Sequence, residues 1–389
     1  MGSFLDRGTG KVYRSIAGKE SAEGGNMVFD VYFAQYLKDF NAMELSRWNY
    51  HYGCVLLGAK YLYEATGKNI YLEAIKVFGE KYVDDDGRIL GFDVEERNVD
   101  LMASGRLLYF LHNVTKESKY EKGIHMIMDA LKKQPRTQDG NFWHKAIYPY
   151  QVWLDGLYMV QPFYMEFEKR YHEKENYHDI ISQFQNVRKY LYDSEKHLYY
   201  HAYDEKKEMI WADKKTGRSP CFWLRAMGWY LMALVDCYEI SEDKNAQEVL
   251  GSLLKEAIDG ILLYRDADKG LFYQLIDRKD LKDNYLETSG SAMVAYSILK
   301  GCRLDILKKE YQKIGIEILA ALEVEKFEIR GGRIYLTGTC ASAGLGPKNE
   351  RNGSPEYYLS EAVKDDNAHG VAMCMMAYSE WLKMEGGKI

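Results

Sequence analysis

Two aspartates stand at equivalent positions of a repeated sequence pattern, and both are candidates for acid–base chemistry. Asp100 lies in the run NVDLMASG and Asp155 in the run WLDGLYM. An offset of 55 residues superimposes Leu108–Leu111 on Phe163–Glu166 and carries Asp100 onto Asp155. A carboxyl group held beside a reacting bond can donate a proton to it or remove one from water. Either aspartate could therefore act as an acid or a base.

The same repeat phase places polar or aromatic side chains at the start of every inner helix that we expect. The other positions in this phase are His51, Trp223 with Arg225, Glu287–Ser289 and His369. If the helices form a ring, their starts converge on one end of a central cavity, which is the geometry of a binding site. Aspartate and serine also cap helix N-termini, so each one alone is explained equally well as a cap. Tryptophan, arginine and histidine are poor caps, and the complete set therefore favours function.

The segment RSPCFWLRAMGWYLMAL carries a second candidate feature. Ser219 as N-cap and Pro220 at the first helical position predict that a helix starts here. Arg225, Gly228 and Trp229 then fall on one face, where the missing side chain of Gly228 would leave room for a sugar carboxylate beside a cation and an indole. The structural alternative is a core tryptophan with an arginine that reaches past it to water.

Other chemistries lack their motifs. The sequence contains no HExxH, GxSxG, GxGxxG or P-loop pattern. His51, His144, His201 and His369 do not have the spacing of metal ligands, so we expect neither a catalytic metal nor a cofactor. The cysteines are scattered without a CxxC pair, and we interpret them as buried thiols rather than as disulfides or a zinc site.

The elements that must position these residues are helices. The run YLYEATGKNIY from Tyr61 matches FLHNVTKESKY from Phe110 at an offset of 49 residues, which indicates one helical hairpin used twice. Four more segments of the same character begin at Pro162, Tyr230, Ala295 and Ala377.

Six hairpins can bury their apolar faces by closing into a ring. We therefore predict an all-α fold, an (α/α)6 barrel formed as a six-hairpin toroid. The barrel would be a single domain over residues 1–389 with a short N-terminal extension of about residues 1–25. Small strand-like segments are expected at Leu198–Ala212 and Phe327–Leu336, as decorations of one rim, and the latter has the Gly-Gly turn of a β-hairpin.

Composition excludes several kinds of partner. The formal net charge is −6 and the pI is near 5.9, which argues against general binding to nucleic acid or to an anionic membrane. An acidic substrate would need locally placed cations. The N-terminus lacks the apolar run of a secretory signal, and no segment is long and apolar enough to span a bilayer. A cytoplasmic protein is expected, and the sequence carries no signal for an oligomeric state.

At this point the motifs resemble a known family. The runs GNFWHKAIYPYQVWLDGLYM, SPCFWLRAMGWYLMALVD and DDNAHG are similar to those of glycoside hydrolase family 105, the unsaturated rhamnogalacturonyl hydrolases, which are related to the family 88 unsaturated glucuronyl hydrolases. The resemblance extends from about Trp48 to the C-terminus. It implies an (α/α)6 barrel that uses no metal, with Asp155 as acid and base and Asp100 as the second active-site aspartate. By the same resemblance the pocket would be lined by Trp48, Tyr50, His51, His144, His201, Trp211, Trp223, Arg225, Trp229 and His369. Lys364 is a candidate partner of the substrate carboxylate because it is close to the DDNAHG run in the sequence.

The resemblance also implies a substrate and a reaction. The partner would be a small oligosaccharide that ends in an unsaturated uronic acid, and hydration of its C4=C5 double bond would release that residue. The closest alternative is a glucuronyl substrate from a glycosaminoglycan or another uronate disaccharide. Asp100 and Asp155 could instead act as the two carboxyl groups of an ordinary glycosidase. From other classes, a sugar epimerase with histidine bases or a non-catalytic carbohydrate-binding toroid could use the same fold.

Overall fold

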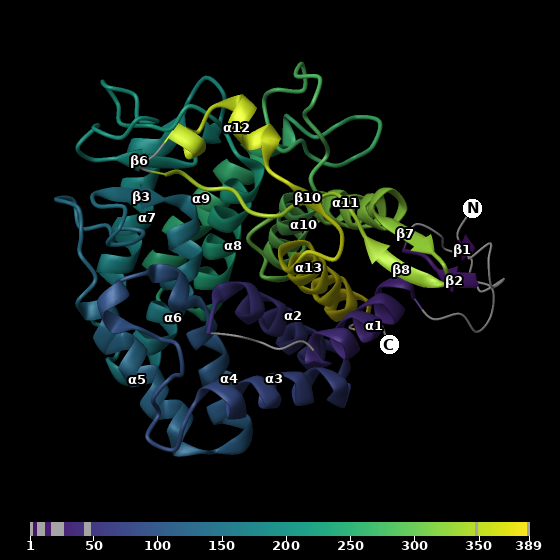
Figure 1. Ribbon diagram of the computed structural model, residues 1–389, viewed down its shortest axis with the longest axis horizontal. Helices are drawn as coiled ribbons and strands as arrows, with labels where there is room; N and C mark the ends of the chain where they lie inside the picture. The colour runs from purple at the N-terminus through teal and green to yellow at the C-terminus, as the bar shows by residue number, and fades with distance from the viewer. Residues whose placement is uncertain (1–2, 6–11, 17–26, 43–47, 347–348, 387–389) are drawn as a thin grey trace.

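The computed structural model describes residues 3–5, 12–16, 27–42, 48–346 and 349–386, and most of them are helical. Helices make up the body of the molecule (Figure 1), and their contacts arrange them as an inner ring with an outer layer. The predicted toroid is confirmed, and solved structures with the same fold are described below. Of the predicted N-terminal extension, the structure describes residues 3–5 and 12–16, and the rest lies outside the described residues.

The inner layer consists of the six helices that the repeat predicted. Around the ring, α6 packs on α8, α8 on α10, α10 on α13, α13 on α2, and α2 on α4. Their bounds are α2 Tyr50–Thr66, α4 Arg106–Thr115, α6 Leu154–Tyr171, α8 Leu224–Ile240, α10 Thr288–Arg303 and α13 Ala368–Gly386.

The outer layer supplies one partner for each inner helix. The partners that follow along the chain are α3 Asn69–Tyr82, α5 Ser118–Lys132, α7 Tyr177–Leu191, α9 Lys244–Leu262 and α11 Lys309–Lys326. The sixth pair joins the two ends of the chain, because α1, Val28–Ala42, packs against α13. The ring therefore closes between the first and last described helices.

The repeat of 49 residues corresponds to the same turn built twice. Thr66 ends α2 and Thr115 ends α4, and each hydroxyl donates to the carbonyl four residues earlier, at 2.7 and 2.9 Å. Each also accepts from the amide two residues later. The residues that follow, Gly67 and Lys116, have φ of 67° and 64°, in the left-handed region that ends helices.

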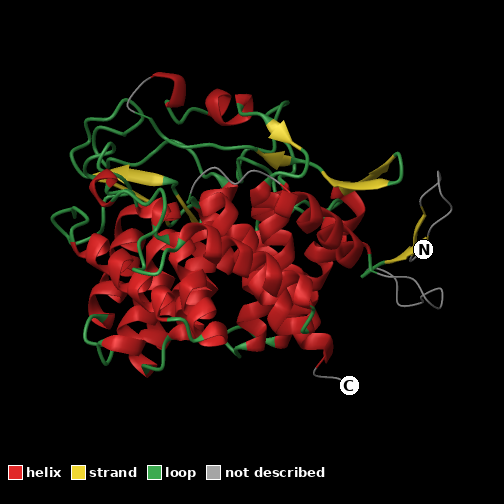
Figure 2. Ribbon diagram, turned by 60° about the horizontal axis from the view of Figure 1, so that its bottom comes forward, coloured by secondary structure: helices red, strands yellow, loops and turns green. Residues whose placement is uncertain are grey.

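The short strands and 3-10 helices lie in the connections, and most of the strands gather on one side of the helical body (Figure 2). The strand pairs are β1 Ser3–Leu5 with β2 Val12–Arg14, β3 Gln151–Trp153 with β6 Ala202–Asp204, β4 Tyr192–Asp193 with β5 Leu198–Tyr199, β7 Phe327–Arg330 with β8 Arg333–Leu336, and β9 Thr339–Cys340 with β10 Val363–Lys364. The 3-10 helices are η1 Val94–Glu96, η2 Val99–Leu101, η3 Ala103–Gly105 and η4 Asn349–Arg351, and one further short helix is α12, Pro355–Ser360.

Both predicted strand-like segments contain strands. The hairpin at 327–336 is confirmed, and its turn uses Gly331 and Gly332 at φ of 59° and 77°. The segment Leu198–Ala212 contains β5 and β6, of which β5 pairs locally with β4 and β6 pairs with the distant β3. The β3–β6 pair brings the start of α6 beside residue 201.

The predicted helix start at Ser219 and Pro220 is also wrong, since α8 begins at Leu224. The Ser219 hydroxyl accepts a hydrogen bond from the Ala202 amide at 3.1 Å instead of capping a helix. The amide of Ser219 donates to the Ala202 carbonyl, and that of Leu224 donates to Gln274. These tertiary hydrogen bonds outweigh the local capping signal.

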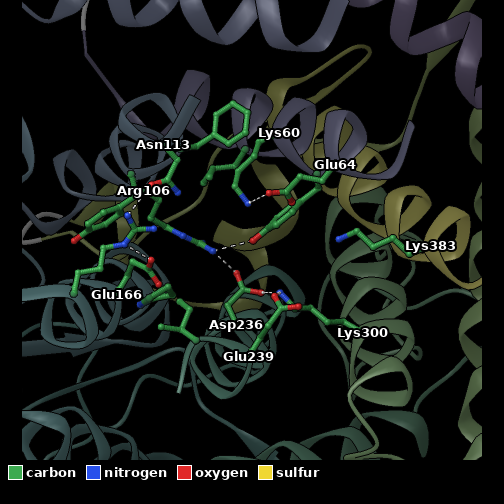
Figure 3. Close-up of a pocket in the computed structure, with 16 residues that line it drawn as sticks. Lys60, Glu64, Arg106, Asn113, Glu166, Asp236, Glu239, Lys300 and Lys383 are labelled. Atoms are coloured by element: carbon green, nitrogen blue, oxygen red, sulfur yellow. Dashed lines mark hydrogen bonds and ion pairs between the residues drawn. The ribbon is translucent and has the colours of Figure 1, made fainter. Parts of the chain in front are cut away.

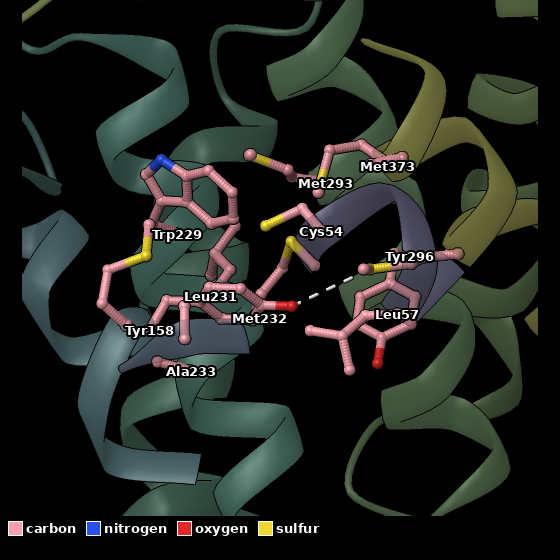
Figure 4. Close-up of a cluster of buried hydrophobic side chains, with 14 of the residues drawn as sticks. Cys54, Leu57, Tyr158, Trp229, Leu231, Met232, Ala233, Met293, Tyr296 and Met373 are labelled. Atoms are coloured by element: carbon pink, nitrogen blue, oxygen red, sulfur yellow. Dashed lines mark hydrogen bonds between the residues drawn. The ribbon is translucent and has the colours of Figure 1, made fainter. Parts of the chain in front are cut away.

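Apolar side chains from the inner helices fill the middle of the barrel (Figure 4). Trp229 from α8 stacks on Tyr158 from α6 at a ring separation of 4.7 Å, and the Tyr158 hydroxyl lies 3.8 Å from the Met376 sulfur. Five of the six cysteines are buried, as expected, and Cys302 is half-buried. Among the described residues, no helix has both the length and the apolar character needed to cross a membrane.

Candidate active site

The repeat phase predicted from the sequence has a simple structural form. In each of six elements, the second residue belongs to the set that the repeat predicted: His51 in α2, Asp100 in η2, Asp155 in α6, Arg225 in α8, Ser289 in α10 and His369 in α13. Trp223 and Glu287, also in that set, immediately precede α8 and α10. The second inner unit differs from the others because it enters through 3-10 turns before α4 begins. All six starts lie at the same end of the ring.

A pocket of about 350 Å³ opens at this end. Six of the residues proposed from the sequence line it: Trp48, Tyr50, His51, Asp100, His144 and Asp155. Loop residues 342–344 and Arg351 complete the wall. This volume matches a small ligand rather than a polymer chain.

Asp155 is 9% exposed and lies beside the fully buried His201. The β3–β6 pair causes this approach, since Trp153 is opposite Ala202 and the Leu154 amide donates to the His201 carbonyl at 3.0 Å. Nε2 of His201 lies 3.1 Å from Oδ2 of Asp155. The two atoms are not aligned as a hydrogen bond, and neither has another partner among the described residues. The carboxyl group of Asp155, which lines the pocket, therefore retains bonding capacity for a ligand.

A tyrosine from a distant segment holds the other side of the His201 ring. The Tyr358 hydroxyl, on α12, lies 2.6 Å from Nδ1 of His201. Burial raises the pKa of Tyr358 well above its usual value, so the phenol keeps its proton and can donate it to Nδ1. With Tyr358 as donor, the neutral imidazole carries its own proton on Nε2, the nitrogen that faces Asp155.

Asp100 has a different environment, which favours its ionised form. Nζ of Lys145 lies 2.6 Å from Oδ2, and Nε2 of His144 lies 3.5 Å from Oδ1. Burial by itself would raise the pKa of Asp100, but Lys145 and His144 outweigh it and the pKa is lowered. Burial lowers the pKa of His144 to about 4, so its imidazole is neutral near pH 7.

The indole of Trp153 lies between the two histidines. His144 stacks on it at a centroid separation of 4.4 Å with nearly parallel rings, and His201 meets it edge-on at 5.2 Å. Backbone hydrogen bonds fix this arrangement, because His144 donates to the Gln151 carbonyl and accepts from the Val99 amide. The Asp100 and Asp155 environments thus share one rigid aromatic wall.

Arg225 lies behind the pocket and is not among the lining residues. It is 1% exposed. Its guanidinium donates to the Ser289 hydroxyl at 2.8 Å, to Glu287 at 3.3 Å and to the Cys340 carbonyl. His369 lies 3.3 Å from the same group and, through Nε2, 3.2 Å from the Tyr50 hydroxyl. Arg225 therefore connects to the pocket through His369 and Tyr50.

The interpretation of Gly228 is wrong, because Met293 fills the space beside it. A Cβ atom at Gly228 would lie 2.3 Å from the Met293 sulfur. Trp229, 1% exposed, belongs to the apolar centre and touches His369 edge-on at 6.3 Å. The glycine permits close helix packing and leaves no room for a sugar carboxylate.

Seven of the proposed residues lie outside the pocket lining: His201, Trp211, Trp223, Arg225, Trp229, His369 and Lys364. Trp223 precedes α8 and packs on His201 at 4.9 Å, so it supports that ring from behind. Trp211 is buried. Lys364 is exposed on β10, where it does not reach the pocket.

Sequence reasoning missed several residues of the wall. Lys145 and Trp153 stand next to residues that were proposed, inside the run from Gly140 to Met159, and their types could have drawn attention to them. Tyr358 and Arg351 come from the segment before α13, and no local pattern connects them with Asp155. Among the described residues, no cluster of three or more histidine, cysteine or acidic side chains is arranged to hold a metal ion.

Comparison with known proteins gives a consistent result. The profile of Glycosyl Hydrolase Family 88 matches residues 30–385. A solved glycoside hydrolase of family 105 from C. acetobutylicum is 37% identical, covers 90% of this chain and 98% of its own, and superimposes with a TM-score of 0.87. The unsaturated glucuronyl hydrolase from Bacillus sp. GL1 is 16% identical with a TM-score of 0.62 over 89% of this chain and 88% of its own, a likeness of fold alone.

Two curated relatives also align. Protein Atu3128 of Agrobacterium fabrum is 40% identical over 58% of this chain and 98% of its own length. The unsaturated rhamnogalacturonyl hydrolase YesR of Bacillus subtilis is 26% identical over 71% of this chain and 76% of its own length.

The helical toroid with two aspartates at one end of its axis is the architecture of a glycoside hydrolase. The chain belongs to glycosyl hydrolase family 88, and its likeness to family 105, expected from its motifs, is confirmed by the C. acetobutylicum enzyme.

Proposed function

We propose that the enzyme removes a terminal 4,5-unsaturated galacturonyl residue from short oligosaccharides that lyases produce from pectin or rhamnogalacturonan. The observation that carries this proposal is Oδ2 of Asp155, a buried oxygen of a pocket residue with no aligned hydrogen-bond partner in the described part of the chain. A buried polar atom left without a partner costs free energy, and a catalytic role is one reason for an enzyme to retain it.

The reaction that fits one such carboxyl group is hydration of the C4=C5 double bond. This double bond is part of a vinyl ether, and Asp155 donates a proton to C4, which leaves an oxocarbenium-like centre at C5. Asp155 then removes a proton from water as the water oxygen bonds to C5. The C5 hemiketal opens to a ketone and leaves a hemiacetal at C1, which releases the remaining sugar as an alcohol. Water is the only co-reactant, and Asp155 ends in its starting state.

The other groups have roles that follow from their positions. His201 lies beside Asp155, with Nε2 at 3.1 Å from Oδ2. Asp100 is held in the ionised form by Lys145, and a fixed negative charge stabilises the positive charge that develops at C5. Two carboxyl groups with different environments thus have different roles.

Two cations in the pocket wall support an acidic substrate. Lys145 is paired with Asp100, whereas Arg351 has no ion pair among the described residues. A Cβ atom at Gly344 would lie 3.1 Å from Nη1 of Arg351 and 3.4 Å from the Trp153 ring, so the guanidinium lies beside the aromatic wall. An arginine in this position can bind a carboxylate with two parallel hydrogen bonds.

A galacturonyl rather than a glucuronyl residue is proposed because YesR, a relative by sequence, is an unsaturated rhamnogalacturonyl hydrolase. The likeness to glucuronyl hydrolases is one of fold. Disaccharides generated by pectin, rhamnogalacturonan and glycosaminoglycan lyases would be incubated with the enzyme. The ultraviolet absorbance of the conjugated double bond should disappear fastest with the galacturonyl substrates, and preference for the glucuronyl substrates would overturn this part of the proposal.

The mechanism is tested with a saturated disaccharide of otherwise identical structure. It should bind without being cleaved, because it offers no vinyl ether to protonate. In deuterated water, deuterium should appear at C4 of the product early in the time course, before enolisation exchanges it. Cleavage of the saturated substrate, or an unlabelled C4, would show direct hydrolysis instead.

A further inference from the structure

A second pocket, of about 330 Å³, lies toward the other end of the barrel (Figure 3). The inner helices that start at the active site contribute their C-terminal halves to it: Tyr61 from α2, Asp236 from α8 and Lys300 from α10. The packed apolar centre shown in Figure 4 contains Trp229 and Tyr158. The Trp229 ring meets His369, and the Tyr158 ring lies 5.1 Å from the guanidinium carbon of Arg106, so the cluster lies between the two pockets. This second pocket is therefore separate from the active site.

The second pocket has a buried floor and a partly exposed rim. On the floor, the side chain of Arg106 is 9% exposed, that of Asp236 is 1% exposed and that of Lys300 is fully buried. At the rim, the side chains of Lys60 and Lys383 are 21% and 22% exposed. A ligand that enters from solvent past the rim lysines would therefore reach charged side chains that are shielded from bulk water.

Asp236, the acidic residue on the floor, accepts hydrogen bonds from three donors. Asp236 accepts from Arg106 at 2.6 Å, from Lys300 at 2.7 Å and from the Tyr296 hydroxyl at 2.6 Å. Lys300 and Arg106 hold the pKa of Asp236 below its usual value, although burial would raise it. Asp236 is therefore a carboxylate whose charge is already balanced, and it has little left to offer a cation.

Arg106, in contrast, has one hydrogen-bond donor without an acceptor. Nη2 of Arg106 donates to Asp236 and, at 3.0 Å, to the Tyr61 hydroxyl. Nη1 of Arg106 is buried and has no hydrogen-bond partner among the described residues. A buried unsatisfied donor of a charged group is costly, and an oxygen acceptor in the adjoining cavity would satisfy it.

The rim adds positive charge around the same point. Ammonium groups of Lys60, Lys300 and Lys383 lie 4.5, 5.3 and 5.1 Å from the centre of the Tyr61 ring. Lys60 and Lys383 pair with acids one helical turn away, Glu64 at 2.9 Å and Glu380 at 3.0 Å. The Lys60–Glu64 pair is partly exposed and therefore weak. Glu380 is fully buried but is also paired with Arg303 at 2.6 Å, so it keeps a cationic partner when Lys383 turns toward a ligand.

We propose that this pocket binds a small oxyanion, whose oxygens accept hydrogen bonds from Nη1 of Arg106 and whose charge is balanced by Lys60 and Lys383. Phosphate, sulfate and compact carboxylates share this chemistry. A planar guanidinium with a free edge is the group best suited to them.

The experiment measures binding rather than catalysis, so it does not depend on the proposed reaction. Sodium sulfate and sodium phosphate would be titrated into the enzyme by calorimetry, and thermal unfolding followed against sodium chloride at equal ionic strength. Saturable binding at millimolar concentration with a raised Tm is expected for both oxyanions. A response equal to that of chloride would overturn the proposal.

Variants locate the bound anion. Arg106→Lys keeps a cation beside Asp236 but removes the Nη1 donor, and it should weaken anion binding at least about tenfold. Lys60→Gln combined with Lys383→Gln should weaken it similarly with little effect on folding. The matched control is Lys255→Gln, which removes another half-exposed lysine paired with an acid four residues away and should leave binding unchanged.

The active site is also able to bind anions, so a third arm separates the two pockets. Lys145→Gln with Arg351→Gln should leave sulfate binding intact, and selenate soaked into crystals should give an anomalous peak beside Arg106. Loss of binding in the Lys145 and Arg351 double variant, or a peak at the active site alone, would overturn the proposal.

Discussion

His201 and Asp155 approach within 3.1 Å, and this contact is set by a backbone pairing rather than by either side chain. Strand β3 ends immediately before the helix that carries Asp155, and strand β6 begins immediately after His201. The antiparallel pairing of the two strands therefore fixes the distance. Since the contact is not an aligned hydrogen bond, the carboxyl group of Asp155 is positioned while Oδ2 remains able to accept a hydrogen bond or bind a proton.

Asp155→Asn should lower kcat by a factor of at least about a thousand, because the amide keeps the shape of the side chain but cannot cycle a proton. The variant should fold normally, with a Tm close to that of the wild type. Asp213→Asn, in an exposed turn of the same rim, serves as a control and should be fully active. Near-native turnover by folded Asp155→Asn would move the acid and base elsewhere, first to Asp100.

Tyr358→Phe tests the proposed tautomer of His201. Without the hydroxyl 2.6 Å from Nδ1, the imidazole proton can reside on either nitrogen and the ring loses its orientation. We expect kcat to fall about tenfold or more with a small change in KM, and the pH dependence of kcat to shift. Tyr357→Phe removes a neighbouring hydroxyl that donates to Glu361 and should leave the pH dependence unchanged. Identical pH profiles for the two variants would contradict the positioning role.

The sequence predicted the ring and its phase because both arise from local periodicity. Thr66 and Thr115 mark the same turn, and six residues of the predicted set, Asp155 among them, are second residues of their elements. Each hairpin obeys the same packing rule, so one repeat predicts the next. A motif resemblance was still needed to single out Asp155 from the other five.

What the sequence could not predict depends on contacts between distant segments. The sequence around Ser219 is typical of a helix N-cap, but Ser219 forms hydrogen bonds with the backbone of Ala202 and caps no helix. Gly228 suggests an open space that Met293 fills from another helix. Tyr358 and Arg351 reach the site from loops whose course is determined by the finished barrel.

Arg225→Ala should lower both stability and activity. It would leave Glu287, which is fully buried, without its cationic partner at 3.3 Å, and breaking a buried pair costs about 3–5 kcal/mol. Arg225→Met combined with Glu287→Gln should restore much of the Tm because it removes both charges. If Arg225 also orients His369 toward the substrate, kcat/KM of this double variant stays low, at a cost of about 2–4 kcal/mol. Recovery of activity together with the Tm would reduce Arg225 to a structural residue.

Stability should fall as the pH drops below 6.5, because two histidines are buried in neutral form. Burial lowers the pKa of His144 to about 4, and burial with Arg225 and His51 lowers that of His369 well below 6.5. Between pH 6.5 and pH 4 the unfolded chain binds a proton at His144 that the folded chain excludes, so His144 costs about 1.5 kcal/mol of stability from pH 6.5 to pH 5. His369 adds a cost of the same sign. Thermal unfolding of His144→Gln should depend less steeply on pH in this range than that of the wild type. The exposed His178→Gln should retain the wild-type slope, and an unchanged slope in His144→Gln would contradict the assignment.

Arg351→Gln should weaken the binding of an anionic substrate more than it slows the chemistry. The guanidinium lines the pocket beside Trp153 and has no ion pair among the described residues, so its charge is available to a carboxylate. Loss of one charge-assisted contact costs about 1.5–3 kcal/mol, which corresponds to a rise in KM of roughly 10- to 100-fold. The effect should shrink as salt is added, since screening weakens the same contact in the wild type. Arg278→Gln, an exposed arginine paired with Asp280, is the matched control and should leave KM and its salt dependence unchanged. Equal KM values for Arg351→Gln and the wild type at low salt would show that the carboxylate is bound elsewhere, and Lys145 would then be the first cation to test.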